Sequence, residues 1–209
     1  MRTNVLFAFI GPRKFKFKKL EYLTEELILS RIEELKFQGF DQIRIPGGSS
    51  KDESHYSGVF VFKYDKDFKQ MFFLGVPYNS IFWKENGSNG HTKKQDETYL
   101  QTACREVFEE TGYHTEESDL ILVFNYFIPD RKDNRKNHTK NFYVCDTFTG
   151  NLHNFEGANL IDKETAAPIW IPVKLFKKVL YYGHQKALIK VIENLSGISA
   201  DYYYALCNL

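Results

Sequence analysis

The stretch CREVFEETGY, residues 104–113, gathers carboxylates at the end of a segment with helical periodicity. Glu106, Glu109 and Glu110 recur at i, i+3 and i+4, so a helix places them on one face. Like charges at this spacing repel by about 0.2–0.5 kcal/mol per pair, and the negative end of the helix dipole costs each exposed carboxylate about 0.3–1 kcal/mol. A cation would relieve both penalties. The three carboxylates therefore indicate a divalent-metal site, with Mg²⁺ or Mn²⁺ as the expected ion.

A magnesium ion held by these residues would keep positions open for phosphate oxygens and could activate a water molecule to attack phosphorus. Arg105 lies beside the acidic face. Glu97 precedes Arg105 by eight residues and returns to within about 80° of it on a helix. We therefore expect a Glu97–Arg105 ion pair that braces the first turn of the helix against the third. Taken alone, the charge run is more typical of a solvated helix face.

The helix that carries these residues is expected from about Glu97 to Thr111. Gly112 suits the left-handed conformation that ends a helix. The apolar residues of the segment fall at i, i+3, i+4, i+7 and i+8 and define one face for the core, namely Leu100, Ala103, Cys104, Val107 and Phe108.

The elements that must position this helix form a mixed order of strands and helices, without the regular alternation of a doubly wound sheet. An N-terminal helix capped by Thr24 and ended by Gly39 shows an apolar stripe of Leu27, Ile28, Ile32 and Leu35. Strands are predicted over residues 5–10 and 13–19, in a hairpin over 57–76, and at 120–127, 141–148 and 168–172. Helices are predicted over 173–182 and 185–195, with Gly183 between them.

The segment PGGSSKDES, residues 46–54, is rich in turn formers. It is the predicted boundary between an N-terminal extension of residues 1–50 and a domain of residues 51–209. The extension has three interpretations: a cap over the site, a dimerisation element, or a separate small module. A fourth interpretation, in which residues 1–50 are an integral subdomain of the fold, is preferred to these three.

Composition excludes several classes of protein. Hydrophobic residues make up 43% of the chain and the net charge is +1, which favours a folded core and argues against a global field for nucleic acid or membranes. The apolar runs are too short to span a bilayer. Three widely spaced cysteines without CxxC spacing argue against disulfides and zinc, so we expect reduced core residues and a cytoplasmic protein.

Glu97, seven residues, Arg105-Glu106-Val107, one residue, Glu109-Glu110, one residue and Gly112-Tyr113 resemble the Nudix box. The resemblance implies an α+β fold of the Nudix type, an α/β/α sandwich with a mixed sheet. It also implies metal ligation by Glu106, Glu109 and Glu110, with Arg105 and Glu97 as the bracing pair.

The opening glycine of the box departs from the family pattern. That glycine should stand six residues before Glu97, where this chain has His91, and Gly90 lies one residue further back. The loop therefore carries one extra residue. By resemblance, Gly90 is the candidate for the backbone carbonyl that a Nudix box can offer to metal.

Substrate contacts are expected in the basic loop 129–140, where Arg131, Lys132 and Arg135 are candidates to bind phosphate. A solubilising loop explains the same charges equally well, and an RNA contact is a third interpretation. For the general base, Glu164 is placed slightly ahead of Glu156 because it is close to Trp170. That ring is either a core residue or a stacking platform.

The resemblance implies a metal-dependent enzyme that hydrolyses the pyrophosphate bond of a nucleoside diphosphate linked to another moiety. The substrate is either a nucleotide sugar or ADP-ribose-like compound, or a noncanonical nucleoside triphosphate. The alternative is a non-catalytic Nudix-fold domain for nucleotide sensing or interaction, and RNA-end processing is more remote. The expected partner is a small nucleotide rather than a nucleic acid or a membrane, and the sequence allows a homodimer.

Overall fold

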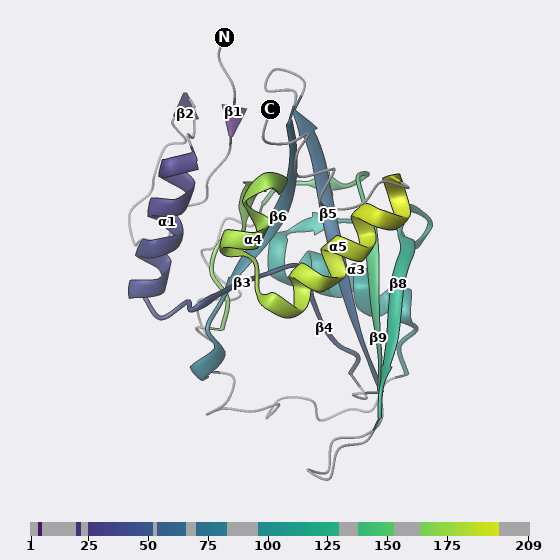
Figure 1. Cartoon of the computed structure of the whole chain (residues 1–209). Coiled ribbons are helices and arrows are strands. Elements are labelled where there is room, and N and C mark those ends of the chain that lie inside the picture. The colour runs from purple at the N-terminus through teal and green to yellow at the C-terminus, as the bar shows by residue number, and fades with distance from the viewer. Residues whose placement is uncertain are drawn as a thin grey trace.

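The computed structural model of the protein describes residues 4–5, 20–21, 25–51, 54–65, 70–82, 96–129, 138–152 and 164–196. Its main element is a seven-stranded sheet between helices (Figure 1). The strands are β3 (Gln42–Arg44), β4 (Gly47–Ser49), β5 (His55–Asp65), β6 (Gln70–Tyr78), β8 (Ile121–Ile128), β9 (His138–Cys145) and β11 (Ile169–Pro172). The helices are α1 (Glu25–Phe37), α3 (Tyr99–Thr111), α4 (Phe176–Val179) and α5 (Tyr182–Ser196).

Two short strand pairs and two 3-10 turns complete these elements. They are β1 (Asn4–Val5) with β2 (Leu20–Glu21), β7 (Tyr113–His114) with β10 (Thr149–Gly150), η1 (Glu117–Asp119) and η2 (Val173–Leu175). None of the helices in the described ranges is both long and apolar enough to cross a membrane. Most of residues 5–10 and all of residues 13–19, where two strands were predicted, lie outside these ranges.

The sheet is mixed, as the sequence predicted. The main path runs β11-β6-β5-β9-β8, in which β5 and β9 are parallel and the other neighbours are antiparallel. Alternation along β5 divides its side chains between two hydrophobic clusters, because Val59 and Val61 join one and Phe60 joins the other.

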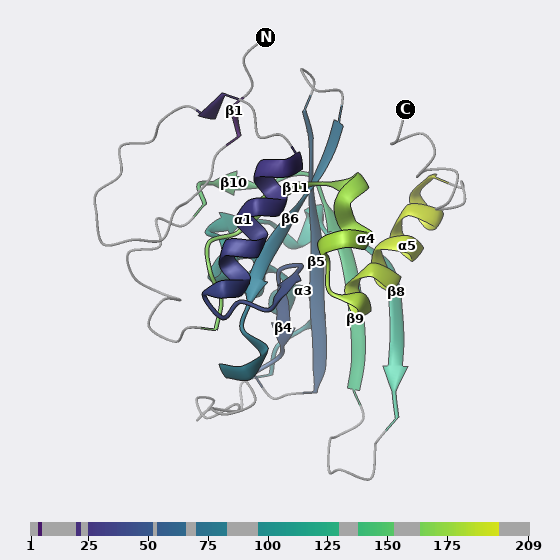
Figure 2. The same cartoon turned by 60° about the vertical axis from the view of Figure 1, so that its left-hand side comes forward.

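The two clusters place helices on both faces of the sheet. On one face, Ala103 and Val107 of α3 are buried against Leu74 and Trp170. On the other face, a larger cluster contains buried residues of α1, α4 and α5. Figure 2 shows α1 towards the β6 side of the sheet and α5 towards the β8 side. The arrangement confirms the predicted α/β/α sandwich.

Strands β3 and β4 fill a split in the middle of the sheet. β5 and β6 pair with each other only near their turn, through residues 62–65 and 70–73. Beyond that point β6 pairs with β3 and β5 pairs with β4. Residues 42–49 thus lie between the two separating strands, and β4 is brought against α3. The segment predicted as a turn-rich linker therefore contains a strand of the main sheet.

Several predicted elements are confirmed with altered bounds. The hairpin of β5 and β6 extends beyond 57–76, and β9 ends at Cys145 instead of residue 148. The helix predicted over 173–182 is replaced by η2 and the short α4, and Gly183 lies inside the first turn of α5.

Two residues assigned to apolar faces are exposed. Leu27 is 47% exposed because the buried stripe of α1 follows Ile28, Ile32 and Leu35, and Leu27 projects from an adjacent position. Phe108 is 39% exposed and stacks on the His114 ring with 4.3 Å between centroids. It covers the end of α3 instead of entering the core.

A Gly75→Ala substitution tests how tightly β6 is packed between β3 and β11. A Cβ at this position would lie 2.6 Å from Ile171 Cδ1 and 2.7 Å from Ile43 Cγ2. We expect a loss of about 1–3 kcal/mol in the free energy of unfolding, measured by urea denaturation. Adding Ile171→Val, which removes Cδ1, should recover part of the loss. A Gly75→Ala variant as stable as the wild type would contradict this packing.

Candidate active site

Helix α3 is capped at both ends by its own sequence. Thr98 accepts a hydrogen bond from the Gln101 backbone N–H, and the Gln101 side chain accepts one from the Thr98 N–H, which completes a capping box. Gly112 adopts a left-handed conformation, with φ at 82°, and its N–H donates to the Phe108 carbonyl. The helix starts at Tyr99 instead of Glu97 because Thr98 is the cap. Glu97 is therefore held just outside the first turn.

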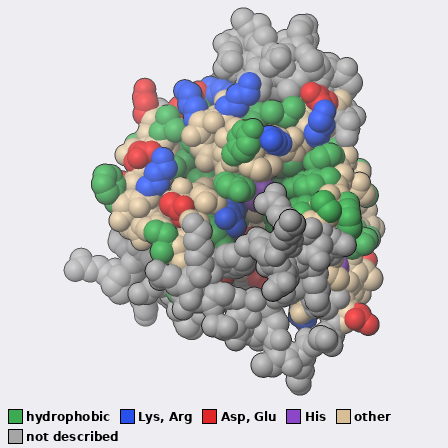
Figure 3. Space-filling view, turned by 60° about the horizontal axis from the view of Figure 1, so that its bottom comes forward, with side chains coloured by type: hydrophobic (Ala, Val, Ile, Leu, Met, Phe, Trp, Pro, Cys, Tyr) green, Lys and Arg blue, Asp and Glu red, His purple; other side chains and the backbone are tan. Residues whose placement is uncertain are grey.

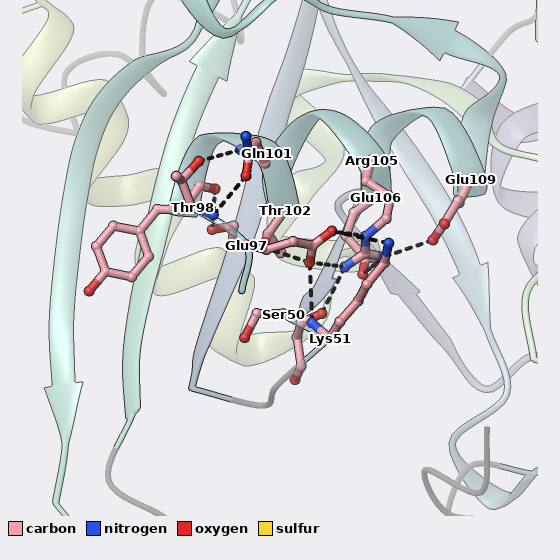
Figure 4. A network of polar contacts seen from close by, with 12 residues as sticks. Ser50, Lys51, Glu97, Thr98, Gln101, Thr102, Arg105, Glu106 and Glu109 are labelled. Atoms are coloured by element: carbon pink, nitrogen blue, oxygen red, sulfur yellow. Dashed lines mark hydrogen bonds and ion pairs between the residues drawn. The ribbon is translucent and has the colours of Figure 1, made fainter. Parts of the chain in front are cut away.

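Arg105 is the centre of the polar network (Figure 4). Its Nε and Nη2 donate to the two oxygens of Glu97 at 2.8 and 3.1 Å, which confirms the predicted bracing pair. Its Nη1 donates to Glu106 at 2.7 Å and to Glu109 at 2.8 Å. Its Nη2 also donates to the Ser49 carbonyl of β4 at 3.0 Å. One guanidinium thus fixes three carboxylates and ties α3 to the strand in the split.

Glu97 is held as a carboxylate by this network. The Lys51 backbone N–H and the Thr102 hydroxyl each donate to its Oε2 at 3.2 Å. Although burial raises the pKa of Glu97, the hydrogen bonds from Arg105 and Lys51 bring that pKa below its usual value. Glu97 is therefore an anionic brace, joined to the chain on both sides of the site.

Glu106 and Glu110 are half-buried side by side. Burial raises the pKa of Glu106 to about 7, against the lowering effect of Arg105. Burial, and then the charge of Glu106, raise the pKa of Glu110 well above its usual value, although the Gly47 N–H donates to Glu110 at 2.8 Å. The two carboxylates strengthen each other's affinity for a proton, and either a proton or a metal ion would relieve their repulsion.

Glu164 belongs to the same acidic group. Its charge raises the pKa of both Glu106 and Glu110. It also hydrogen-bonds with the hydroxyl of Tyr78, whose pKa is raised first by burial and further by Glu164. The candidate for the general base thus lies beside the two buried carboxylates, although it comes from the segment before β11 and not from α3.

The site carries more negative than positive charge. In the described part of the chain it holds five carboxylates and three basic groups, namely Glu97, Glu106, Glu109, Glu110 and Glu164 with Arg44, Lys51 and Arg105. Figure 3 shows acidic side chains recessed near the middle of one face of the molecule. An excess of carboxylates over basic side chains is typical of a site that binds a cation.

The donor set fits a hard divalent cation through a small number of ligands. No three acidic, histidine or cysteine side chains in the described ranges are grouped closely enough to hold a metal by themselves. Glu109 is 52% exposed and is bonded to Arg105, whereas Glu106 is 13% exposed and Glu110 is half-buried. Two carboxylates are enough for Mg²⁺, which commonly keeps waters and takes its remaining ligands from phosphate. Glu106 and Glu110 are the residues that fit.

The sequence reasoning missed the backbone that lines the carboxylates. A Cβ built on Gly48 would lie 2.5 Å from both oxygens of Glu106, and one on Gly47 would lie 2.6 Å from the Ser57 carbonyl. Only glycine allows this approach of strand and carboxylate. The pair of glycines after Pro46 is a signal for close backbone contact that was interpreted as a turn.

Several candidates lie outside the described residues. These are Gly90 and His91 of the loop before α3, and Arg131, Lys132 and Arg135 of the basic loop. Glu156 also lies outside. Trp170 is 4% exposed and packs against Tyr113 and Phe148, so it is a core residue and not a stacking platform.

Comparison with known proteins identifies a family. A family model described as NUDIX domain matches residues 78–194, and no curated protein sequence matches the chain. The solved NUDIX domain of Shewanella oneidensis NrtR, complexed with ADP ribose, is 15% identical, with 67% of this chain and 86% of that chain covered and a TM-score of 0.46. The Ap4A hydrolase of C. elegans is 15% identical, with 68% of this chain and 97% of that chain covered and a TM-score of 0.41. The MutT NUDIX hydrolase of Burkholderia pseudomallei is 16% identical, with 71% of this chain and 98% of that chain covered and a TM-score of 0.39.

The raised pKa of Glu106 predicts a pH dependence of stability in metal-free buffer. Between its unfolded pKa of about 4.5 and about 7, the folded state holds more protons, so Glu106 destabilises the fold increasingly as pH rises. His184, whose pKa burial lowers to about 3, gives the opposite slope up to its unfolded value of about 6.5. The difference in unfolding free energy between wild type and Glu106→Gln cancels the His184 contribution and reports that of Glu106 together with its effect on Glu110.

We expect Glu106→Gln to gain stability relative to wild type as pH rises from 5 to 8 in EDTA. Adding Mg²⁺ should cancel that gain by stabilising the wild type. The exposed Glu33 of α1 supplies the control, since Glu33→Gln should keep a constant difference from wild type. A constant difference for Glu106→Gln as well would show that its pKa is not raised.

Gly48→Ala tests the contact between β4 and Glu106. Because the added methyl group would occupy the position of the carboxylate, we expect Mn²⁺ binding, measured by calorimetry, to weaken by about tenfold or more. Ser49→Ala is the matched control, since the carbonyl that accepts from Arg105 belongs to the backbone. Equal Mn²⁺ affinity in the two variants would show that Gly48 does not contribute to the metal site.

Proposed function

The chain belongs to the NUDIX domain family, and we propose that it hydrolyses the pyrophosphate bond of a nucleoside diphosphate linked to another moiety. The observation that carries the proposal is the half-buried pair of Glu106 and Glu110 at the end of the motif helix, in a group of five carboxylates and three basic side chains. A diphosphate cannot approach such a group of carboxylates unaided, so the proposal includes Mg²⁺ or Mn²⁺ as the cofactor.

Glu106 and Glu110 are the proposed main ligands of that cation. Glu109 is the third carboxylate of the proposal, and its ion pair with Arg105 would have to open for it to reach the metal. When bound, the cation would neutralise charge on the diphosphate and lower the pKa of a water molecule that attacks phosphorus. The backbone of Gly47 and Gly48 would limit the space around the ligands. Gly90 is retained as the proposed source of a backbone carbonyl ligand.

Glu164 is the proposed general base. It shares the electrostatic environment of Glu106 and Glu110, and the Tyr78 hydroxyl contacts it. A carboxylate beside the proposed metal ligands is placed to accept a proton from a metal-bound water molecule. Arg105 and Glu97 act as positioning residues, because they hold the ligand helix against β4 and the Lys51 backbone.

The substrate class remains a choice between two groups. Nucleotide sugars and ADP-ribose-like compounds would yield a nucleoside monophosphate and a phosphorylated product, and a noncanonical nucleoside triphosphate would yield a monophosphate and pyrophosphate. Arg131, Lys132 and Arg135 are retained as proposed contacts to substrate phosphate. A screen of both groups with Mg²⁺ and Mn²⁺, with products identified by mass, decides between them.

Carboxamide substitutions test the reaction. Glu106→Gln and Glu110→Gln should each lower turnover of the best substrate by at least about 100-fold, because each removes a charge from the proposed metal site. Glu33→Gln on α1 should leave turnover unchanged. Thermal denaturation shows whether each variant is folded. Wild-type turnover in folded Glu110→Gln would refute the ligand assignment, and nucleotide binding without hydrolysis by the wild type would favour a sensor.

A further inference from the structure

Arg44 is held in an unusual position beside the acidic group. It stands at the end of β3 opposite Val76 of β6, and Tyr78 lies two residues further along β6, on the same face. Its Cζ atom lies 3.5 Å from the centre of the Tyr78 ring and 5.1 Å from that of Tyr181. The Nε donates to Gln42 Oε1 at 2.9 Å, which sets the orientation of the guanidinium plane. Arg44 is therefore half-buried between two aromatic rings in a fixed orientation.

This arrangement leaves the charge of Arg44 without a carboxylate partner in the described part of the chain. The other two basic groups of the site are committed, since Arg105 pairs with three carboxylates and Lys51 lies 3.9 Å from Glu97. Arg44 nevertheless lies close to the acidic group, because it precedes Gly47, whose N–H donates to Glu110, by three residues along the chain. A fixed positive side chain beside a proposed metal site is suited to bind an anion that contacts both the side chain and the metal.

The two rings decide which kind of ligand fits. The Tyr78 ring lies against the guanidinium and the Tyr181 ring lies nearby, so the space for a nucleobase to stack on Arg44 is reduced. The N–H groups of a guanidinium lie in one plane, and its edge matches the oxygens of a phosphate. The available chemistry is that of in-plane hydrogen bonds to an anion.

We propose that Arg44, clamped by Tyr78 and Tyr181, binds the second phosphate of the substrate. This inference rests on the proposed function, in which the cation held by Glu106 and Glu110 takes the other phosphate. The pair of positive centres then selects compounds with two linked phosphates over monophosphates. Tyr181, which is 42% exposed, borders this subsite at the surface.

Equilibrium binding of inorganic pyrophosphate and of inorganic phosphate, with Mg²⁺ present, tests the subsite without turnover. We expect Arg44→Gln to weaken pyrophosphate binding by about 10- to 100-fold, which corresponds to the loss of charge-assisted hydrogen bonds, and to change phosphate binding much less. Arg44→Lys should fall between, because the charge remains but the planar, stacked group is lost. Tyr181→Ala, at an exposed ring, should weaken pyrophosphate binding without loss of the fold.

Circular dichroism and thermal denaturation identify variants that fail to fold, and Arg44→Lys serves where Arg44→Gln does not fold. A lower Tm with unchanged pyrophosphate affinity would show that Arg44 is only a structural clamp and would overturn the inference. Equal losses for phosphate and pyrophosphate would overturn it too. If no nucleotide is hydrolysed but pyrophosphate binding depends on Arg44, the proposed function fails and the subsite stands. If turnover depends on Glu110 but Arg44→Gln leaves pyrophosphate binding unchanged, the proposed function stands and the proposed subsite is wrong.

Discussion

The partial burial of two neighbouring carboxylates, Glu106 and Glu110, is the constraint that the surrounding structure has to meet. An isolated buried charge costs several kcal/mol, and two of the same sign cost more. The chain reduces this cost with the Arg105 guanidinium and with the N–H of Gly47, which donate to Glu106 and Glu110 respectively. The raised pKa values show that these donors do not cancel the cost. The remaining imbalance is what a bound cation would remove, so the site is stable only to the extent that protons or metal occupy it.

The split between β5 and β6 is the structural answer to that constraint. If the two strands paired along their whole length, side chains would face α3 across the sheet and no backbone N–H would reach Glu110. With residues 42–49 inserted, a glycine strand approaches the helix and offers one N–H to Glu110 and one carbonyl to Arg105. The inserted residues crowd Gly75 and Gly58, where neighbouring side chains leave little room for a Cβ.

The chemistry-bearing helix could be predicted from the sequence because its signals are local. Periodicity located α3, Gly112 ended it, and the spacing of Glu97 and Arg105 predicted a pair that the structure contains. The part that could not be predicted depends on pairing between distant segments. Gly47 precedes Glu110 by 63 residues, and nothing in the turn-rich composition of that segment specifies which strand it joins. The distinction between buried Glu106 and half-exposed Glu109 has the same origin, since β4 covers one and not the other.

A neutral histidine on the opposite face of the sheet completes the electrostatic design. His184 of α5 accepts the Ile45 N–H at Nδ1, so its proton resides on Nε2, which faces the Tyr56 hydroxyl at 3.3 Å. Burial lowers the pKa of His184 to about 3, with the charge of Arg44 acting in the same direction. The imidazole therefore supports the backbone at Ile45, two residues before Gly47, as a neutral group. Because Arg44 and Lys140 already place positive charge near this ring, a protonated histidine would add repulsion on this face of the sheet. A neutral acceptor can thus fix the segment that leads into β4 without opposing the cation of Arg44.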